Sequence, residues 1–260
     1  MPLRSLVDRS GPLARAARAV LPAECLPIGY LTNLTLKRTG SRVRSGPFAG
    51  MHYISDSVGS AYLPKLLGIY ERELAGVVER VCAIEPLTLI NIGAGEGYYS
   101  VGIAARNHQA RVIAFENDRN GRQALGEMAK LNGVQDRIEI YGWCEEQHLL
   151  QALRDARNAV IICDIEGGEN GLLNPLRVPA LAKASILAEM HDFIRPGITG
   201  EIEGRFKQTH LIQCIRQEPR SRADFPWRTI GTTLLPKSYL DWAVSEWRPA
   251  QMCWLWMEPK

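Results

Sequence analysis

The stretch LTLINIGAGEG, residues 87–97, decides the fold of this 260-residue chain. An apolar run of strand type ends at three closely spaced glycines, and a helical pattern begins at Tyr98. Glycine allows a tight turn and brings backbone N–H groups close to a ligand. A strand, a glycine loop and a helix in this order are typical of α/β domains that bind a nucleotide-like ligand where the strands end.

Strand and helix patterns alternate along the chain after this stretch. The strands are apolar throughout, which predicts a parallel sheet covered on both faces. The last two strands enclose a segment rich in Pro, Arg and Trp, with no room for a regular crossover helix, so an antiparallel hairpin is expected at that edge. The predicted strands are residues 87–92, 111–116, 137–142, 159–165, 185–191, 210–216 and 252–257. The predicted helices that alternate with them are residues 98–107, 119–131, 145–154, about 170–173 and 200–209.

The chain before residue 83 has a different character. It reads as a helix at Pro12–Leu21, a basic linker at 39–46, a turn-rich segment at 47–62 and one amphipathic helix at Pro64–Cys82. Residues 1–46 carry a net charge of +6, whereas the other 214 residues carry −3. We therefore predict two parts, which are a basic N-terminal arm and helical cap at 1–82 and an α/β domain at 83–260 with an insert at 217–250.

Composition excludes several classes of protein. No apolar run approaches the roughly 18 residues of a membrane span, and arginines interrupt any secretory h-region, although an Arg-rich mitochondrial presequence remains an alternative. The six cysteines lack CxxC or CxxH spacing, so structural zinc is not expected. Three of them, Cys163, Cys214 and Cys253, lie in strand-like runs and are predicted to be buried, reduced thiols of a cytoplasmic protein.

An acidic residue, Glu116, ends the strand that follows the glycine loop. A carboxylate at this place can accept both hydroxyls of a ribose. An NAD enzyme would show the same residue, but the loop reads G-x-G-x-G and lacks the third glycine of G-x-G-x-x-G. An NAD-dependent oxidoreductase is therefore the weaker alternative.

These motifs resemble those of class I S-adenosylmethionine (SAM) methyltransferases over residues 87–216. INIGAGEG resembles the first motif, AFEND the second and CDIEGGE the fourth. Within the class, the DIEGGE segment (164–169) and the later EMH (189–191) are similar to the FkbM-type family, which mostly methylates hydroxyls of sugars and secondary metabolites. The resemblance implies an α/β, Rossmann-like, seven-stranded, mostly parallel sheet, an N-terminal helical cap and SAM as cofactor.

The resemblance also places the cofactor. The position of Asn91 is usually acidic in the class, and Asn cannot offer charge to the methionine ammonium of SAM. Trp143 is expected either to stack on the adenine or to be a core aromatic. The residues expected to bind SAM are Asn91, Gly93, Ala94, Gly95, Gly97, Glu116, Asn117, Trp143, Cys144 and Asp164.

Five acids and one imidazole are expected to converge where the fourth and fifth strands end, and such a cluster needs a proton, a cation or a basic substrate. The favoured interpretation makes His191 a general base, with Asp164 and Glu189 as catalytic partners. A divalent metal such as Mg²⁺, held by Asp164, Glu166 and Glu189, is possible but not favoured. Alternatively the acids cap a helix and bind arginines. The residues of the cluster are Asp164, Glu166, Glu169, Glu189, His191 and Asp192.

The expected reaction is methyl transfer to a hydroxyl of a small molecule or sugar. N-methylation, or a non-catalytic SAM-binding module, are alternatives. A nucleic acid substrate is not favoured, because an Asn/Asp-Pro-Pro-aromatic motif does not follow the fourth strand and an acidic flank repels phosphates. The insert is expected to cap the acceptor or to form the surface of a homo-oligomer.

Overall fold

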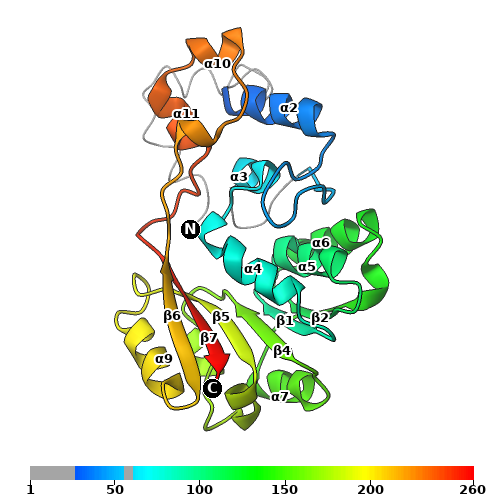
Figure 1. Cartoon of the computed structure of the whole chain (residues 1–260), viewed down its shortest axis with the longest axis vertical. Coiled ribbons are helices and arrows are strands. Elements are labelled where there is room, and N and C mark those ends of the chain that lie inside the picture. Colours follow the sequence, from blue (N-terminus) through cyan, green and yellow to red (C-terminus); the bar gives the residue numbers. More distant parts are fainter. Residues whose placement is uncertain (1–26, 56–60) are drawn as a thin grey trace.

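The computed structural model describes residues 27–55 and 61–260 (Figure 1). The predicted helix at Pro12–Leu21 and Cys25 lie outside these residues. One seven-stranded sheet has the order β3-β2-β1-β4-β5-β7-β6, and β7 runs antiparallel to both of its neighbours. The strands are β1 Thr88–Ile92, β2 Arg111–Phe115, β3 Ile138–Tyr141, β4 Ala159–Cys163, β5 Ser185–Met190, β6 His210–Arg216 and β7 Cys253–Pro259.

The predicted fold class is confirmed, including the antiparallel pair at the edge. Alternate residues of β1, β2, β4, β5 and β7 enter two hydrophobic clusters, one on each face of the sheet. Leu89 of β1 joins the face covered by α4, α5 and α6, and its neighbour Ile90 joins the face covered by α7, α8, η5 and α9. These helices are α4 Ala75–Cys82, α5 Tyr98–Arg106, α6 Arg119–Leu131, α7 Glu146–Arg154, α8 Glu169–Leu172, η5 Pro179–Lys183 and α9 Ile198–Phe206, with the 3₁₀ turn η4 Gln135–Arg137 before β3.

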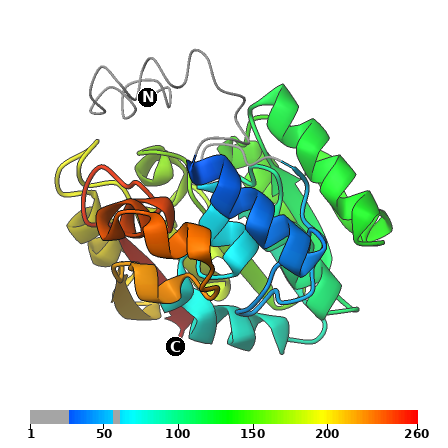
Figure 2. The same ribbon diagram turned by 90° about the horizontal axis from the view of Figure 1, so that it is seen from above.

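The insert and the N-terminal segment pack together above the carboxyl edge of the sheet, as Figures 1 and 2 show. Leu31, Leu63, Phe225 and Val244 share a third hydrophobic cluster. The Tyr30 hydroxyl also lies 2.9 Å from Thr229 Oγ1. We call this assembly the cap; it comprises α2 Pro27–Thr39, α3 Tyr62–Leu67, η6 Arg222–Asp224, α10 Ile230–Leu234 and α11 Lys237–Ala243.

Helix α2 was not predicted from the sequence. Its first turn has no acidic residue, so local signals for its start are weak. Burial of Leu31 and Thr35 in the structure shows that tertiary packing stabilises it. The basic linker predicted after it is partly packed, because Val43 is buried and bonded through its backbone to Met51.

The single helix predicted over Pro64–Cys82 is wrong. It is divided into α3, the 3₁₀ turn η3 Arg72–Leu74 and α4. The break lies at Gly68, whose φ is +73°, and a Cβ atom there would lie 1.9 Å from the carbonyl oxygen of Ser45. The apolar spacing continues through the break because the segments on both sides face hydrophobic clusters.

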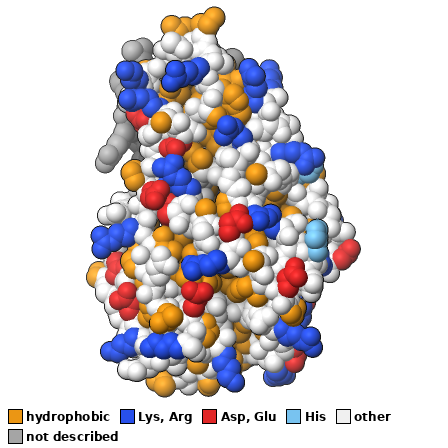
Figure 3. Space-filling model, in the orientation of Figure 1, with side chains coloured by type: hydrophobic (Ala, Val, Ile, Leu, Met, Phe, Trp, Pro, Cys, Tyr) orange, Lys and Arg blue, Asp and Glu red, His pale blue; other side chains and the backbone are white. Residues whose placement is uncertain are grey.

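The cysteine prediction is partly wrong. Cys163 is buried, but Cys253 is half-buried and Cys214 is exposed on the edge strand β6. No helix among the described residues has the length and apolar character that crossing a membrane requires. Lys and Arg side chains are spread over the face shown in Figure 3, at the cap end and at the opposite end alike.

Replacing Gly68 with Ala should lower the free energy of unfolding by about 2 kcal/mol or more, because the left-handed backbone and the contact with Ser45 both disfavour a Cβ atom. Gly204→Ala is the matched control, since nothing lies within 4 Å of a Cβ atom there. That exposed helical change should be neutral or stabilise by up to about 1 kcal/mol. Urea unfolding measures both variants, and equal stability of the two would contradict this account of the break.

Candidate active site

The glycine loop after β1 is tied to the end of β2. The N–H groups of Gly93 and Ala94 donate to the carbonyl oxygen of Phe115, at 2.9 and 3.0 Å. A Cβ atom on Gly93 would lie 1.8 Å from the carbonyl oxygen of Asp164, so glycine is required where this loop crosses the end of β4. These two N–H groups are therefore bonded within the protein and are not among the N–H groups that the loop could bring to a ligand.

Glu116 is oriented by two backbone donors. Its Oε2 accepts from Gly95 N at 2.7 Å and its Oε1 from Asp118 N at 2.7 Å. Gly121 leaves room for this carboxylate, since a Cβ atom there would lie 2.9 Å from Glu116 Cγ. Each carboxylate oxygen has a further lone pair, so Glu116 keeps acceptor capacity for the hydroxyls of a ligand.

Two other predicted cofactor residues differ in their surroundings. Asn91 is buried and its amide donates to Ser100 Oγ at 2.8 Å, which joins β1 to α5. Trp143 is 64% exposed beyond the end of β3, so its alternative role as a core aromatic is wrong. Its stacking on a cofactor stays a prediction, as do contacts of the exposed Asn117 and the half-buried Cys144.

Asp164, Glu189 and His191 come together as predicted, where β4 and β5 end. One ligand-type atom of each lies within 4.8 Å of the others. The Nε2 atom of His191 lies 3.6 Å from an oxygen of Asp164 and 3.6 Å from an oxygen of Glu189. Asp164 is the accessible member of the group, with 34% of its side chain exposed, whereas the His191 side chain is 5% exposed.

Glu169 orients the imidazole, a role that the sequence analysis did not assign. The buried Oε1 of Glu169 lies 2.9 Å from His191 Nδ1 and accepts from Ile165 N at 3.2 Å. An ionised carboxylate can only accept, so the proton lies on Nδ1 and the lone pair of Nε2 faces Asp164 and Glu189. Although burial opposes ionisation of Glu169, the hydrogen bond from His191 lowers its pKa below the usual value.

The electrostatics of His191 suit a base. Burial disfavours the imidazolium, but the hydrogen bond to Glu169 and the charge of Asp164 outweigh it. The pKa of His191 is therefore raised above its ordinary value of 6.5. A base of this kind takes up a proton readily near neutral pH.

Two of the acids expected in this cluster have other positions. Asp192 Oδ1 accepts from Gly197 N at 3.0 Å, so its carboxylate bonds the start of α9. Glu166 is exposed, and its backbone φ is +51°. The N–H of the next residue, Gly167, donates to Glu169 Oε1 at 3.3 Å. A turn therefore separates Glu166 from the candidate metal group, which contains His191 in its place.

Arg248 of the insert reaches the cluster, which sequence spacing could not show. Its guanidinium donates to Glu189 and to Glu71, and its Nε donates to Glu246 at 3.0 Å. Arg220 lies 2.8 Å from the other oxygen of Glu246. Arg248 therefore supplies positive charge at Glu189.

Burial governs the protonation of this network. Desolvation raises the pKa of Glu71 to about 7, although Arg248 opposes the shift. Desolvation and the nearby charge of Asp164 raise the pKa of Glu189 well above its usual range. A raised pKa favours the protonated carboxyl, so burial limits the negative charge beside His191.

Glu96, in the glycine loop, forms a second set of contacts that was not predicted from the sequence. It is fully buried, forms an ion pair with Lys65 of α3 and accepts a hydrogen bond from the Tyr53 hydroxyl. The Lys65 ammonium also lies 4.9 Å from the centre of the Tyr70 ring. This contact joins the cap to the loop after β1.

The raised pKa of Glu71 predicts a pH dependence of stability. The folded-state pKa of about 7 exceeds the ordinary value of 4.5 for a glutamate. The protonated carboxyl therefore stabilises the folded state below pH 4.5. This stabilisation is lost as the pH rises toward about 7, by up to about 1.4 kcal/mol per pH unit. Glu71→Gln should remove this slope in urea unfolding between about pH 5 and pH 7. Glu203→Gln on α9 is the control, and an unchanged slope in Glu71→Gln would contradict the assignment.

No protein-family model and no curated protein matches the chain. Among solved structures, the METTL16 MTase domain is 14% identical, with a TM-score of 0.50 over 89% of this chain and 80% of that one. A putative O-methyltransferase from Klebsiella pneumoniae is 12% identical over 94% of both chains, with a TM-score of 0.45. A precorrin-6Y C5,15-methyltransferase from Geobacter metallireducens is 12% identical over 72% of this chain and 86% of that one, at 0.46. The chain has the Rossmann-like fold of the class I methyltransferases.

Proposed function

We propose that the chain is a SAM-dependent methyltransferase that methylates a hydroxyl of a small molecule or sugar. The observation that carries the proposal is the pair of Glu169 and His191, whose Nε2 is aimed at the end of β4 beside the glycine loop. The FkbM-type resemblance supports the hydroxyl as acceptor. Membership of the FkbM-type family stays a prediction, because no family model matches the chain.

The residues at the strand ends fit SAM. β1 lies between β2 and β4 in the sheet, so the glycine loop, Glu116 and Asp164 are neighbours at one edge. Glu116 would accept the ribose hydroxyls, and the exposed Trp143 would border the adenine. When bound, SAM supplies a methyl group on a positively charged sulfonium, and the nearby carboxylates favour that charge.

The protein's own contribution is to position the acceptor and to remove its proton. A hydroxyl is a weak nucleophile unless a base takes its proton as the new bond forms. The Nε2 atom of His191 would accept this proton, and Glu169 would stabilise the resulting imidazolium through Nδ1. The accessible carboxylate of Asp164 would hold the acceptor hydroxyl beside Nε2. The carboxylates of Asp164 and Glu169 beside this imidazole make the site a poor place for a phosphate backbone, which supports a small acceptor over a nucleic acid.

Glu116→Ala should weaken the binding of S-adenosylhomocysteine by about tenfold or more, because a carboxylate fixed for two hydroxyls is lost. Isothermal titration calorimetry measures the affinity. Glu127→Ala on α6 is the control and should bind as the unaltered protein does. If the unaltered protein does not bind S-adenosylhomocysteine at millimolar concentration, the proposed function is wrong.

The pH profile of methyl transfer should rise as His191 loses its proton, with a midpoint above 6.5. Glu169→Gln removes an interaction that raises the His191 pKa, so the midpoint should move to lower pH. His191→Asn should remove this limb and lower the rate about 10²- to 10⁴-fold. Initial rates with labelled SAM and a panel of alcohols and amines measure the effect. Transfer to amines alone, or a profile that His191→Asn leaves intact, would contradict O-methylation by this base.

A further inference from the structure

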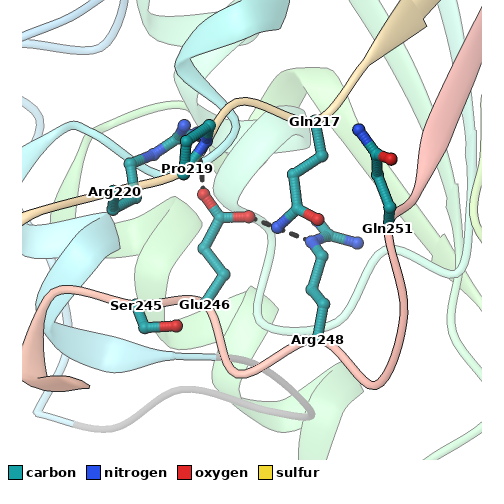
Figure 4. A pocket seen from close by; sticks show the side chains of 7 residues that line it. All are labelled: Gln217, Pro219, Arg220, Ser245, Glu246, Arg248 and Gln251. Carbon is teal, nitrogen blue, oxygen red and sulfur yellow. Dashed lines mark hydrogen bonds and ion pairs between the residues drawn. The ribbon is translucent and has the colours of Figure 1, made fainter. Parts of the chain in front are cut away.

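A pocket of about 400 Å³ lies between the two segments that connect the cap to the sheet (Figure 4). We call these segments, residues 217–220 and 245–251, the neck. The pocket volume falls within the range of small-molecule sites. Its polar lining consists of Gln217, Arg220, Ser245, Glu246, Arg248 and Gln251.

The pocket adjoins the candidate active site. Gln217 directly follows β6, and its N–H donates to the carbonyl oxygen of Met252 at 3.0 Å. In the sheet register, Cys253 pairs with Arg216 on one side and with Met190, just before His191, on the other. Arg248 is the shared wall, because it lines the pocket and donates to Glu189, whose other oxygen lies 3.6 Å from His191 Nε2.

The charged groups around the pocket are paired within the protein. Figure 4 shows the Glu246 carboxylate between Arg220 and Arg248, and its contacts to them are 2.8 and 3.0 Å. The buried network has two guanidinium groups, those of Arg220 and Arg248, and four carboxyl groups that form ion pairs with them. Each charged lining group is therefore already paired, so a charged ligand group could bind it only by breaking a buried ion pair at a high cost in free energy. The carboxyl groups of the network are those of Glu71, Glu73, Glu189 and Glu246.

The uncharged lining offers hydrogen bonds instead. The carboxamides of Gln217 and Gln251 line the pocket (Figure 4) and make no hydrogen bond among the described residues. A carboxamide donates and accepts at once, which matches neighbouring hydroxyls that do the same. No other described residue of the neck forms a hydrogen bond with these two carboxamides.

We propose that the neck pocket binds the non-reacting part of the acceptor and that this part is an uncharged polyhydroxyl group held by Gln217 and Gln251. The inference rests on the proposed function, since it takes His191 as the reacting end. The reacting hydroxyl would lie beside His191, and the remainder of the acceptor would pass Arg248 into the pocket. The insert would then be part of the binding site rather than only a cover.

NMR of the protein saturated with S-adenosylhomocysteine tests the proposal without knowledge of the true acceptor. The probes are methyl α-D-glucopyranoside, its uronate and its 2-amino derivative, each at millimolar concentration. The neutral probe should shift the side-chain amide signals of Gln217 and Gln251 in a saturable way, and the two charged probes should bind several-fold more weakly. The signals are assigned from the single variants Gln217→Leu and Gln251→Leu.

The double variant with both leucines should bind the neutral probe about tenfold more weakly, while its affinity for S-adenosylhomocysteine stays unchanged. Gln213→Leu, an exposed change on β6 outside the pocket, is the matched control and should bind the probe normally. Absence of a saturable shift, equal binding of the double variant, or preference for a charged probe would overturn the inference. Failure to bind S-adenosylhomocysteine would instead overturn the proposed function.

Discussion

The buried carboxylate of Glu246 between Arg220 and Arg248 is the interaction on which the arrangement of this molecule depends. It joins the outgoing and returning segments of the neck, and its Oε1 also accepts from the N–H of Glu71. Removing one partner of such a buried set leaves an uncompensated charge, which costs about 3–5 kcal/mol. The network therefore holds the cap over the carboxyl edge of the sheet by a directional constraint that hydrophobic packing alone would not supply.

The same network reaches the chemistry through Arg248. Glu189, predicted as a catalytic partner of His191, is buried against this arginine and lies at the inner wall of the site. Asp164 is the accessible carboxylate, and Glu169 is the partner that fixes the imidazole. Three carboxyl groups that look alike in the sequence thus have different surroundings, because burial, hydrogen bonding and a guanidinium act on each to a different degree.

The fold could be predicted in large part from local patterns. Strands buried on both faces have apolar residues at nearly every position, and the glycine loop marks the first crossover, so the strand positions and their mostly parallel direction followed from the sequence. The cap was harder to predict because its stability comes from contacts between residues far apart in the chain. Leu31 of α2 packs with Val244 of the insert, and Gly68 breaks a helix because of the backbone of Ser45. Neither contact has a signature in hydrophobic periodicity.

The sequence by itself determined which residues stand at the ends of β1, β2, β4 and β5, because the end of a strand is a local property and parallel strands present their carboxyl ends at one edge. Gly93, Glu116, Asp164 and His191 were found in this way. Only the tertiary structure decided which of the clustered acids touch the imidazole, that Asp192 bonds the start of α9 instead, and that Arg248 enters from the insert. The reason is physical: charge balance and hydrogen-bond direction depend on distances in space, and these distances join segments that lie far apart along the chain.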